Sequence, residues 1–211
     1  MRTLVIETAT AACSVALIED GRVVDSRHEV VGRGHAERLV PMIGELDGGG
    51  RAAGVLVDCG PGSFTGIRVG IAAARGLGIG WGVAATGFSS LPLVAAAAFA
   101  RMPGHDRVAV VMEGGHGEVF VQRYRRDPFA ALEAFGSMKP EAAIAAIGSL
   151  TAIGDGVRHL LSIDPSLSPV EAYPIAADAI LLPAGFRVLA PTPIYGREPD
   201  AKLPGGRAPS A

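Results

Sequence analysis

The stretch DCGPGSFTGIRVGIAAARGLGIGWG, residues 58–82, decides the fold of this chain. It begins as the end of a strand, turns at Pro61-Gly62-Ser63 and continues as a helix for which Ser63 or Thr65 can serve as N-cap. At 100° per residue, its small and apolar side chains form two adjacent stripes, and only Arg68 and Arg75 mark a polar edge. A helix that is apolar nearly all round is buried on more than one side.

The glycines inside this helix need a packing reason, because each costs about 1 kcal/mol relative to alanine. They are Gly66, Gly70, Gly76 and Gly78. Close approach to a sheet on one side and to a second helix on the other would supply that reason. A chain of this size offers few internal partners for both sides, so the pattern indicates that another protein packs against the helix.

The composition limits the kinds of protein with which this sequence is compatible. The 211 residues are 49% hydrophobic and 19% charged, with a net charge of −2, which suits one large domain or two small lobes. The charge opposes autonomous binding of tRNA or DNA, and glycines, polar residues and Pro92 interrupt the apolar run 76–100, which opposes a membrane span. Cys13 and Cys59 are expected to be buried, reduced thiols of a cytosolic protein.

Hydrophobic periodicity predicts the order βββαβαβα for the first half of the chain. The strands are expected at 3–7, 13–18, 22–30, 54–58 and 83–85, and the helices at 35–46 and 89–101, with the glycine-rich helix of the stretch 58–82 between them. After Pro103-Gly104, a second unit repeats this order weakly. It has strands at 107–112, 118–124, 132–136 and 150–153, and helices at 141–147, 156–161 and 175–182.

The loop after the first strand is one candidate site. Thr8, Thr10 and Ser14 could cradle a phosphate with their hydroxyls, and Glu7 lies where an enzyme of this layout would want a carboxylate for a magnesium-bound nucleotide. The same segment also reads simply as a polar hairpin tip.

Other chemical motifs are missing. The loop 60–66 matches neither a P-loop nor a dinucleotide fingerprint nor a nucleophile elbow, so Ser63 is interpreted as a helix cap. No two histidines are three or four residues apart, and no cysteine pair has metal spacing. His35 is interpreted as a capping or packing residue.

Three segments together resemble the bacterial TsaB (YeaZ) family. They are residues 7–17 (ETATAACSVAL), residues 35–43 (HAERLVPMI) and residues 60–70 (GPGSFTGIRVG). Residues 117–120 and 195–201 are similar as well. The resemblance covers the first half of the chain densely and the second half sparsely.

The resemblance implies an α/β chain with the actin-like ATPase (ribonuclease H-like) fold, built of two lobes, each with a mixed sheet and flanking helices. Residues 1–102 would form the N-terminal lobe with the partner-binding helices, 103–198 a smaller degenerate lobe, and 199–211 a mobile tail. Two positions depart from the family pattern: Glu7 stands where the family has Asp, and Glu113-Gly114-Gly115-His116 where it favours Asp-Ala-Arg.

The implied function is that of a non-catalytic, cytoplasmic assembly partner and activator of the TsaD transferase, which makes threonylcarbamoyladenosine beside the tRNA anticodon. The ATPase TsaE would join the complex, tRNA would bind only through it, and the chain alone would form a homodimer. No cofactor is expected, with weak nucleotide binding only within the complex. The interface residues would be His35, Leu39, Met42, Gly66, Ile67, Gly70, Ile71, Ala74 and Leu77.

The residues support the non-catalytic role. The sister transferase holds its metal through a His-x-x-x-His pair on the first helix, whereas this chain has His35 and Leu39, and one imidazole cannot assemble such a site. No catalytic or metal residue is therefore assigned. The alternative from another class is an ATP-dependent enzyme of the actin-like superfamily, a phosphotransferase or a peptidase. A stand-alone tRNA binder is a third possibility, which the net charge opposes.

Overall fold

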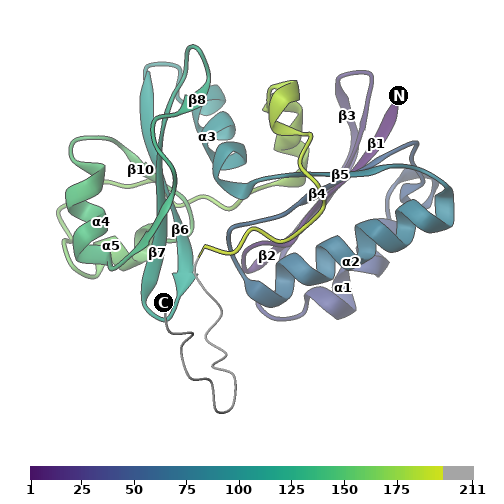
Figure 1. Cartoon of the computed structure of the whole chain (residues 1–211), viewed down its shortest axis with the longest axis horizontal. Coiled ribbons are helices and arrows are strands. Elements are labelled where there is room, and N and C mark those ends of the chain that lie inside the picture. The colour runs from purple at the N-terminus through teal and green to yellow at the C-terminus, as the bar shows by residue number, and fades with distance from the viewer. Residues whose placement is uncertain (197–211) are drawn as a thin grey trace, which may run out of the picture.

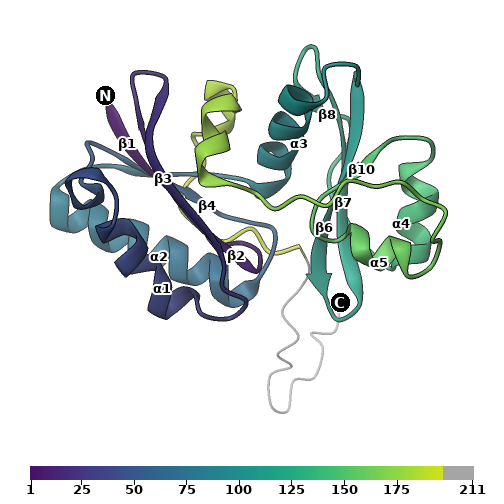
Figure 2. The same cartoon turned by 180° about the vertical axis from the view of Figure 1, so that it is seen from behind.

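The computed structural model describes residues 1–196, so the expected tail at 199–211 lies outside the described residues. Two sheets stand side by side with helices between and outside them (Figures 1 and 2). The arrangement is a mixed α/β fold of two sheets with flanking helices, as the resemblance implies.

The first sheet is mixed and has the strand order β3-β2-β1-β4-β5. Its strands are β1 (Arg2–Glu7), β2 (Ala12–Glu19), β3 (Arg22–Val30), β4 (Val55–Asp58) and β5 (Ala85–Phe88). The strands β1, β4 and β5 run parallel, while β2 and β3 are antiparallel neighbours on one side. Asp20 and Gly21 adopt positive φ at the tip of the β2–β3 hairpin, as the sequence predicts for a tight turn.

Helices cover both faces of this sheet. On one face lie α1 (His35–Gly44) and α2 (Phe64–Trp81), joined through the short 3₁₀ helix η1 (Asp47–Gly50) and β4. On the other face lies α3 (Ser90–Arg101), whose apolar side chains pack against β1, β4 and β5. The predicted order βββαβαβα is confirmed.

The second sheet is built on the long hairpin of β6 (Arg107–Gly115) and β7 (Glu118–Arg125). The short strands β8 (Ala130–Ala131) and β9 (Gly136–Met138) pair with β7, and β10 (Ala152–Ile153) runs parallel to β6. The single strand predicted at 132–136 is wrong. There Glu133 bonds the side chains of Arg123 and Gln122 instead of extending the ladder.

The helix α3 is sandwiched between the two sheets, which explains why its side chains are apolar all round (Figure 1). Leu93 and Ala96 face the first sheet, while Leu91, Val94 and Phe99 face the second. The helices α4 (Pro140–Ile147) and α5 (Val157–Leu161) cover the far side of the second sheet. This stacking places the two sheet ends around one cleft.

The chain finally returns to the first sheet. The 3₁₀ helix η2 (Ala176–Leu181), where the sequence predicts an α-helix, packs against β1 and β2 and is followed by η3 (Ala184–Phe186). Leu189 pairs with Gly87 of β5, and the Ile194 N–H donates to the Cys59 carbonyl at 2.7 Å. The predicted division at residues 102 and 103 places residues 176–194 in the second lobe. In the structure, these residues contact the first lobe.

Candidate functional site

The first glycines of α2 face this chain's own sheet. A Cβ atom added at Gly66 would lie 2.0 Å from the carbonyl oxygen of Thr8, and one added at Gly70 would lie 2.4 Å from its Oγ1. The Thr8 hydroxyl also donates a 2.8 Å hydrogen bond to the Gly66 carbonyl. Ser63 caps the helix by accepting from the Gly66 N–H at 3.3 Å, as predicted. These glycines therefore let α2 lie directly on the loop after β1.

The predicted partner surface is consequently wrong for most of its residues. The side chains of His35, Leu39, Met42, Ile67, Ile71 and Ala74 are buried within the chain, as are Gly66 and Gly70, and Leu77 is half-buried. His35 Nε2 lies 3.0 Å from the Ala12 carbonyl oxygen. Helical periodicity defines apolar stripes, but it does not say which stripe faces the sheet.

Apart from Phe64 in the first turn of α2, the exposed apolar residues of α1 and α2 lie on the opposite side. We call this surface the outer helix face. On α2, Ile79 is 84% exposed and a Cβ atom added at Gly76 would meet nothing within 4 Å. On α1, Val40 is 66% exposed. The two helices lie side by side (Figures 1 and 2), so one mostly apolar surface extends over both, with Glu37 of α1 and Arg75 of α2 exposed beside it. Its exposed members are Ala36, Val40, Pro41, Gly44, Ala72, Gly76, Ile79 and Gly80.

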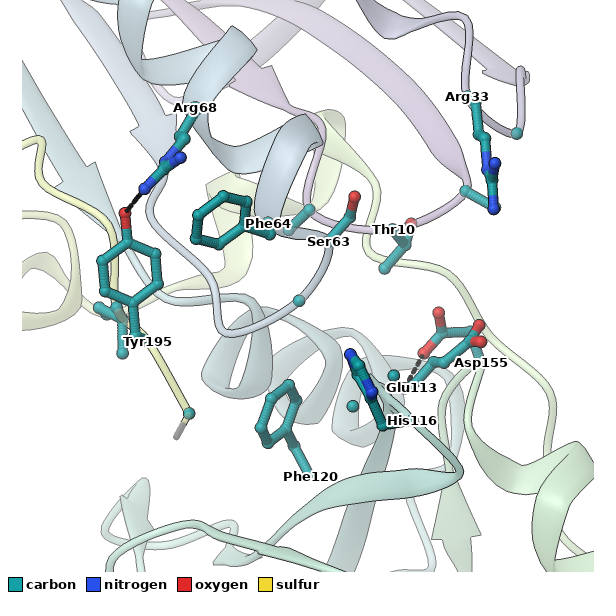
Figure 3. Close-up of a pocket in the computed structure, with 18 residues that line it drawn as sticks. Thr10, Arg33, Ser63, Phe64, Arg68, Glu113, His116, Phe120, Asp155 and Tyr195 are labelled. Carbon is teal, nitrogen blue, oxygen red and sulfur yellow. Dashed lines mark hydrogen bonds between the residues drawn. The ribbon is translucent and has the colours of Figure 1, made fainter. Parts of the chain in front are cut away.

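The arginines of α2 are engaged along one flank of the helix. Arg68 donates to the Tyr195 hydroxyl at 2.9 Å, and its guanidinium carbon lies 3.5 Å from the Phe64 ring centroid (Figure 3). Arg75 donates to the Pro191 carbonyl at 2.7 Å. Both residues thereby hold the C-terminal segment against α2. The polar edge visible in the sequence thus marks an internal contact along one flank of the outer helix face.

A cleft of about 790 Å³ separates the two lobes. Thr10, Ser63 and Phe64 line it from the first lobe, and Glu113 and Asp155 from the second (Figure 3). Burial raises the pKa of Asp155 to about 6, although its carboxylate accepts a 3.1 Å hydrogen bond from the Glu113 N–H. The cleft occupies the place where the two sheets converge.

The predicted phosphate loop is committed to internal hydrogen bonds. Besides Thr8, Ser14 donates to the Arg27 carbonyl and accepts from the Ala176 N–H, and Thr10 accepts from the Ala12 N–H. Glu7 is fully buried, with Oε1 bonded to the Ala9 N–H at 2.6 Å. Of these four residues only Thr10 lines the cleft.

These residues do not fit a magnesium nucleotide, because Mg²⁺ keeps most of its water ligands and needs accessible oxygens. In residues 1–196, no group of three or more His, Cys, Asp or Glu side chains could hold a metal ion. The thiols of Cys13 and Cys59 are buried, and burial raises their pKa values to about 12 and about 11. Both cysteines are therefore unreactive thiols at neutral pH.

None of the helices in the described part of the chain has the length and hydropathy of a bilayer-spanning segment. The longest, α2, has 18 residues and carries Arg68 and Arg75.

Comparison with known proteins identifies relatives over most of the chain. Residues 23–138 match the family model of TsaD, tRNA N6-adenosine threonylcarbamoyltransferase. The tRNA threonylcarbamoyladenosine biosynthesis protein TsaB of Escherichia coli is 40% identical over 132 residues, which cover 60% of this chain and 56% of that protein. The chain thus spans about half the length of the curated TsaB relatives that it matches.

Solved structures extend the likeness to the whole fold. A Pseudomonas aeruginosa protein described as similar to the peptidase YeaZ superposes with a TM-score of 0.75 at 30% identity, covering 93% of this chain and 99% of that one. The ethanolamine utilization protein EutJ of Carboxydothermus hydrogenoformans, at 13% identity and a TM-score of 0.50, covers 86% of this chain and 88% of its own and shares the fold alone.

Proposed function

Because this chain belongs to the TsaB (YeaZ) family, whose curated members are named for tRNA threonylcarbamoyladenosine biosynthesis, we propose that it is a non-catalytic subunit that binds and activates a TsaD-like transferase. The observation that carries this proposal is the outer helix face. It is a mostly apolar surface of small and apolar side chains on two adjacent helices, with the charged Glu37 exposed on α1 and Arg75 exposed on α2.

Such a surface suits a helix-to-helix interface. Small side chains let helix axes approach, and dispersion contacts then accumulate over many atoms. A standard interface buries about 800 Å² on each partner, an area that two adjacent helices can supply. Activation requires that the chain bind the competent conformation of the transferase more tightly than the inactive one.

Three further features complete the proposal. In the absence of the transferase, a second copy of this chain covers the outer helix face and forms a homodimer. A TsaE-like ATPase joins only after the heterodimer has formed. The tRNA binds through the complex, since a chain with a net charge of −2 and no basic stripe supplies few phosphate contacts of its own.

The proposal is tested by mixing the purified chain with the TsaD-like transferase of the same organism. Size-exclusion chromatography with light scattering is expected to show the homodimer converting to a stable heterocomplex, because both assemblies use the same surface. Separate elution of the two proteins at micromolar concentrations, or addition of the transferase to an intact homodimer, would contradict it.

The rival function is an ATP-dependent phosphotransferase or peptidase. Calorimetry with ATP and Mg²⁺ on the isolated chain is expected to give no saturable binding heat up to millimolar nucleotide, because the hydroxyls of Thr8 and Ser14 are engaged within the protein and Glu7 is buried. Tight binding with release of phosphate would establish the rival function.

A further inference from the structure

Two carboxyl groups lie side by side at the ends of adjacent parallel strands. The β1–β4 register pairs Ile6 with Val57, so the next residues, Glu7 and Asp58, are neighbours on strands about 4.8 Å apart. Their side chains project to the same face of the sheet, the face that α3 and η2 cover. Neither residue has any exposed surface.

Each carboxyl uses one oxygen and leaves the other without a partner. Glu7 Oε1 accepts from the Ala9 N–H at 2.6 Å, and Asp58 Oδ1 accepts from the Gly60 N–H at 2.7 Å and the Ser90 hydroxyl at 2.8 Å. Glu7 Oε2 and Asp58 Oδ2 are buried and bond nothing. Burial of an unpaired carboxylate is costly, and burial of two adjacent ones is more so.

The surroundings provide no compensating positive charge. Within residues 1–196, no lysine, arginine or histidine forms an ion pair with either carboxyl. Ser14 of β2 faces Glu7, Ser90 of α3 faces Asp58, and the segment before α5 contributes Asp155, whose charge also raises the pKa of Glu7. The thiols of Cys13 and Cys59 lie nearby and are neutral. Every ionisable neighbour is thus an acid.

We propose that Glu7 and Asp58 share one proton in the folded chain and that this proton joins the two loops that carry the start of α2. An O–H between Oε2 and Oδ2 gives both orphaned oxygens a partner and leaves the pair with a single negative charge. The same pair holds the loops through its outer oxygens. The Ala9 carbonyl accepts from the Ser63 N–H, and the Gly60 carbonyl accepts from the Ser90 N–H.

The proton makes stability depend on pH. Burial, and then the charge of Asp58, raise the pKa of Glu7 well above its ordinary value, and burial raises the pKa of Asp58 to about 7. In unfolded chains both groups titrate near pH 4. The folded chain therefore binds more protons between about pH 4 and pH 7. The resulting stabilisation is complete below the unfolded pKa and is lost as the pH rises through the folded one.

Urea unfolding between pH 5 and 9 tests the proposal. In the wild-type chain, the folding equilibrium constant is expected to fall by up to about tenfold per pH unit for the one proton held only by the folded state, and to level off once the pH has passed the folded pKa of the pair. Glu7→Gln is expected to remove most of this fall, because the amide N–H can donate to Asp58 Oδ2 in place of the proton. Asp155→Asn, a nearby buried acid outside the pair, is expected to retain the fall near pH 7.

Carboxyl ¹³C NMR on the wild-type chain provides a measurement that does not depend on the variants. At pH 6, the Glu7 and Asp58 resonances are expected to report one bound proton between them. Both carboxyls ionised at pH 6, or parallel unfolding profiles for wild type and Glu7→Gln, would overturn the proposal.

Discussion

Gly66→Ala is expected to destabilise the folded chain by about 3 kcal/mol or more, although alanine is the better helix former. The new Cβ would stand 2.0 Å from the backbone oxygen of Thr8 and 3.3 Å from Ser63 Oγ. Neither atom can move away without a large cost in free energy, because Thr8 follows the central strand β1 and Ser63 caps α2. Urea unfolding monitored by circular dichroism measures the loss.

Gly76→Ala in the same helix is the matched control. A Cβ atom there meets nothing within 4 Å, so the variant is expected to gain about 0.5–1 kcal/mol from helix propensity. If the two variants change stability equally, the packing of α2 described above is incorrect.

Ala72→Arg is expected to weaken binding of the TsaD-like transferase by at least about 100-fold while the chain stays folded. Ala72 is exposed on the outer helix face, between the half-buried Val69 and the exposed Gly76. A buried, unpaired guanidinium would oppose any apolar partner surface. Titration calorimetry gives the affinity, and light scattering is expected to show a monomer in the absence of the transferase.

Ala142→Arg is the control for this substitution. Ala142 is an exposed alanine on α4, at the far side of the second sheet. The Ala142→Arg variant adds the same charge as Ala72→Arg. It is expected to leave both the affinity for the transferase and the homodimer unchanged. Equal losses in the two variants would point to a general effect of charge, and loss with Ala142→Arg alone would move the interface to α4.

Much of the first lobe could be predicted from the sequence because its signals are local. Asp20-Gly21 defines the hairpin, short apolar runs define strands such as β1 and β4, and Ser63 caps α2. The family resemblance supplied the actin-like fold, which residue patterns alone would have left as one of several α/β arrangements.

The direction in which α2 faces could not be predicted. Both stripes of the helix are small and apolar, and the decisive contact is between Gly66 and the Thr8 backbone, 58 residues away in sequence. The hydrogen-bond partners of the loop 8–14 could not be predicted for a similar reason. Its hydroxyls look like phosphate ligands, but the partner of Ser14 comes from Ala176, beyond any local pattern.

The most direct test of the central claim is site-specific photo-crosslinking in the assembled complex. A benzophenone side chain placed at Ile79, the most exposed apolar residue of the outer helix face, is expected to crosslink the TsaD-like transferase, and the same group at Ala142 to give no such product. Crosslinking from position 142 with none from position 79 would contradict the account.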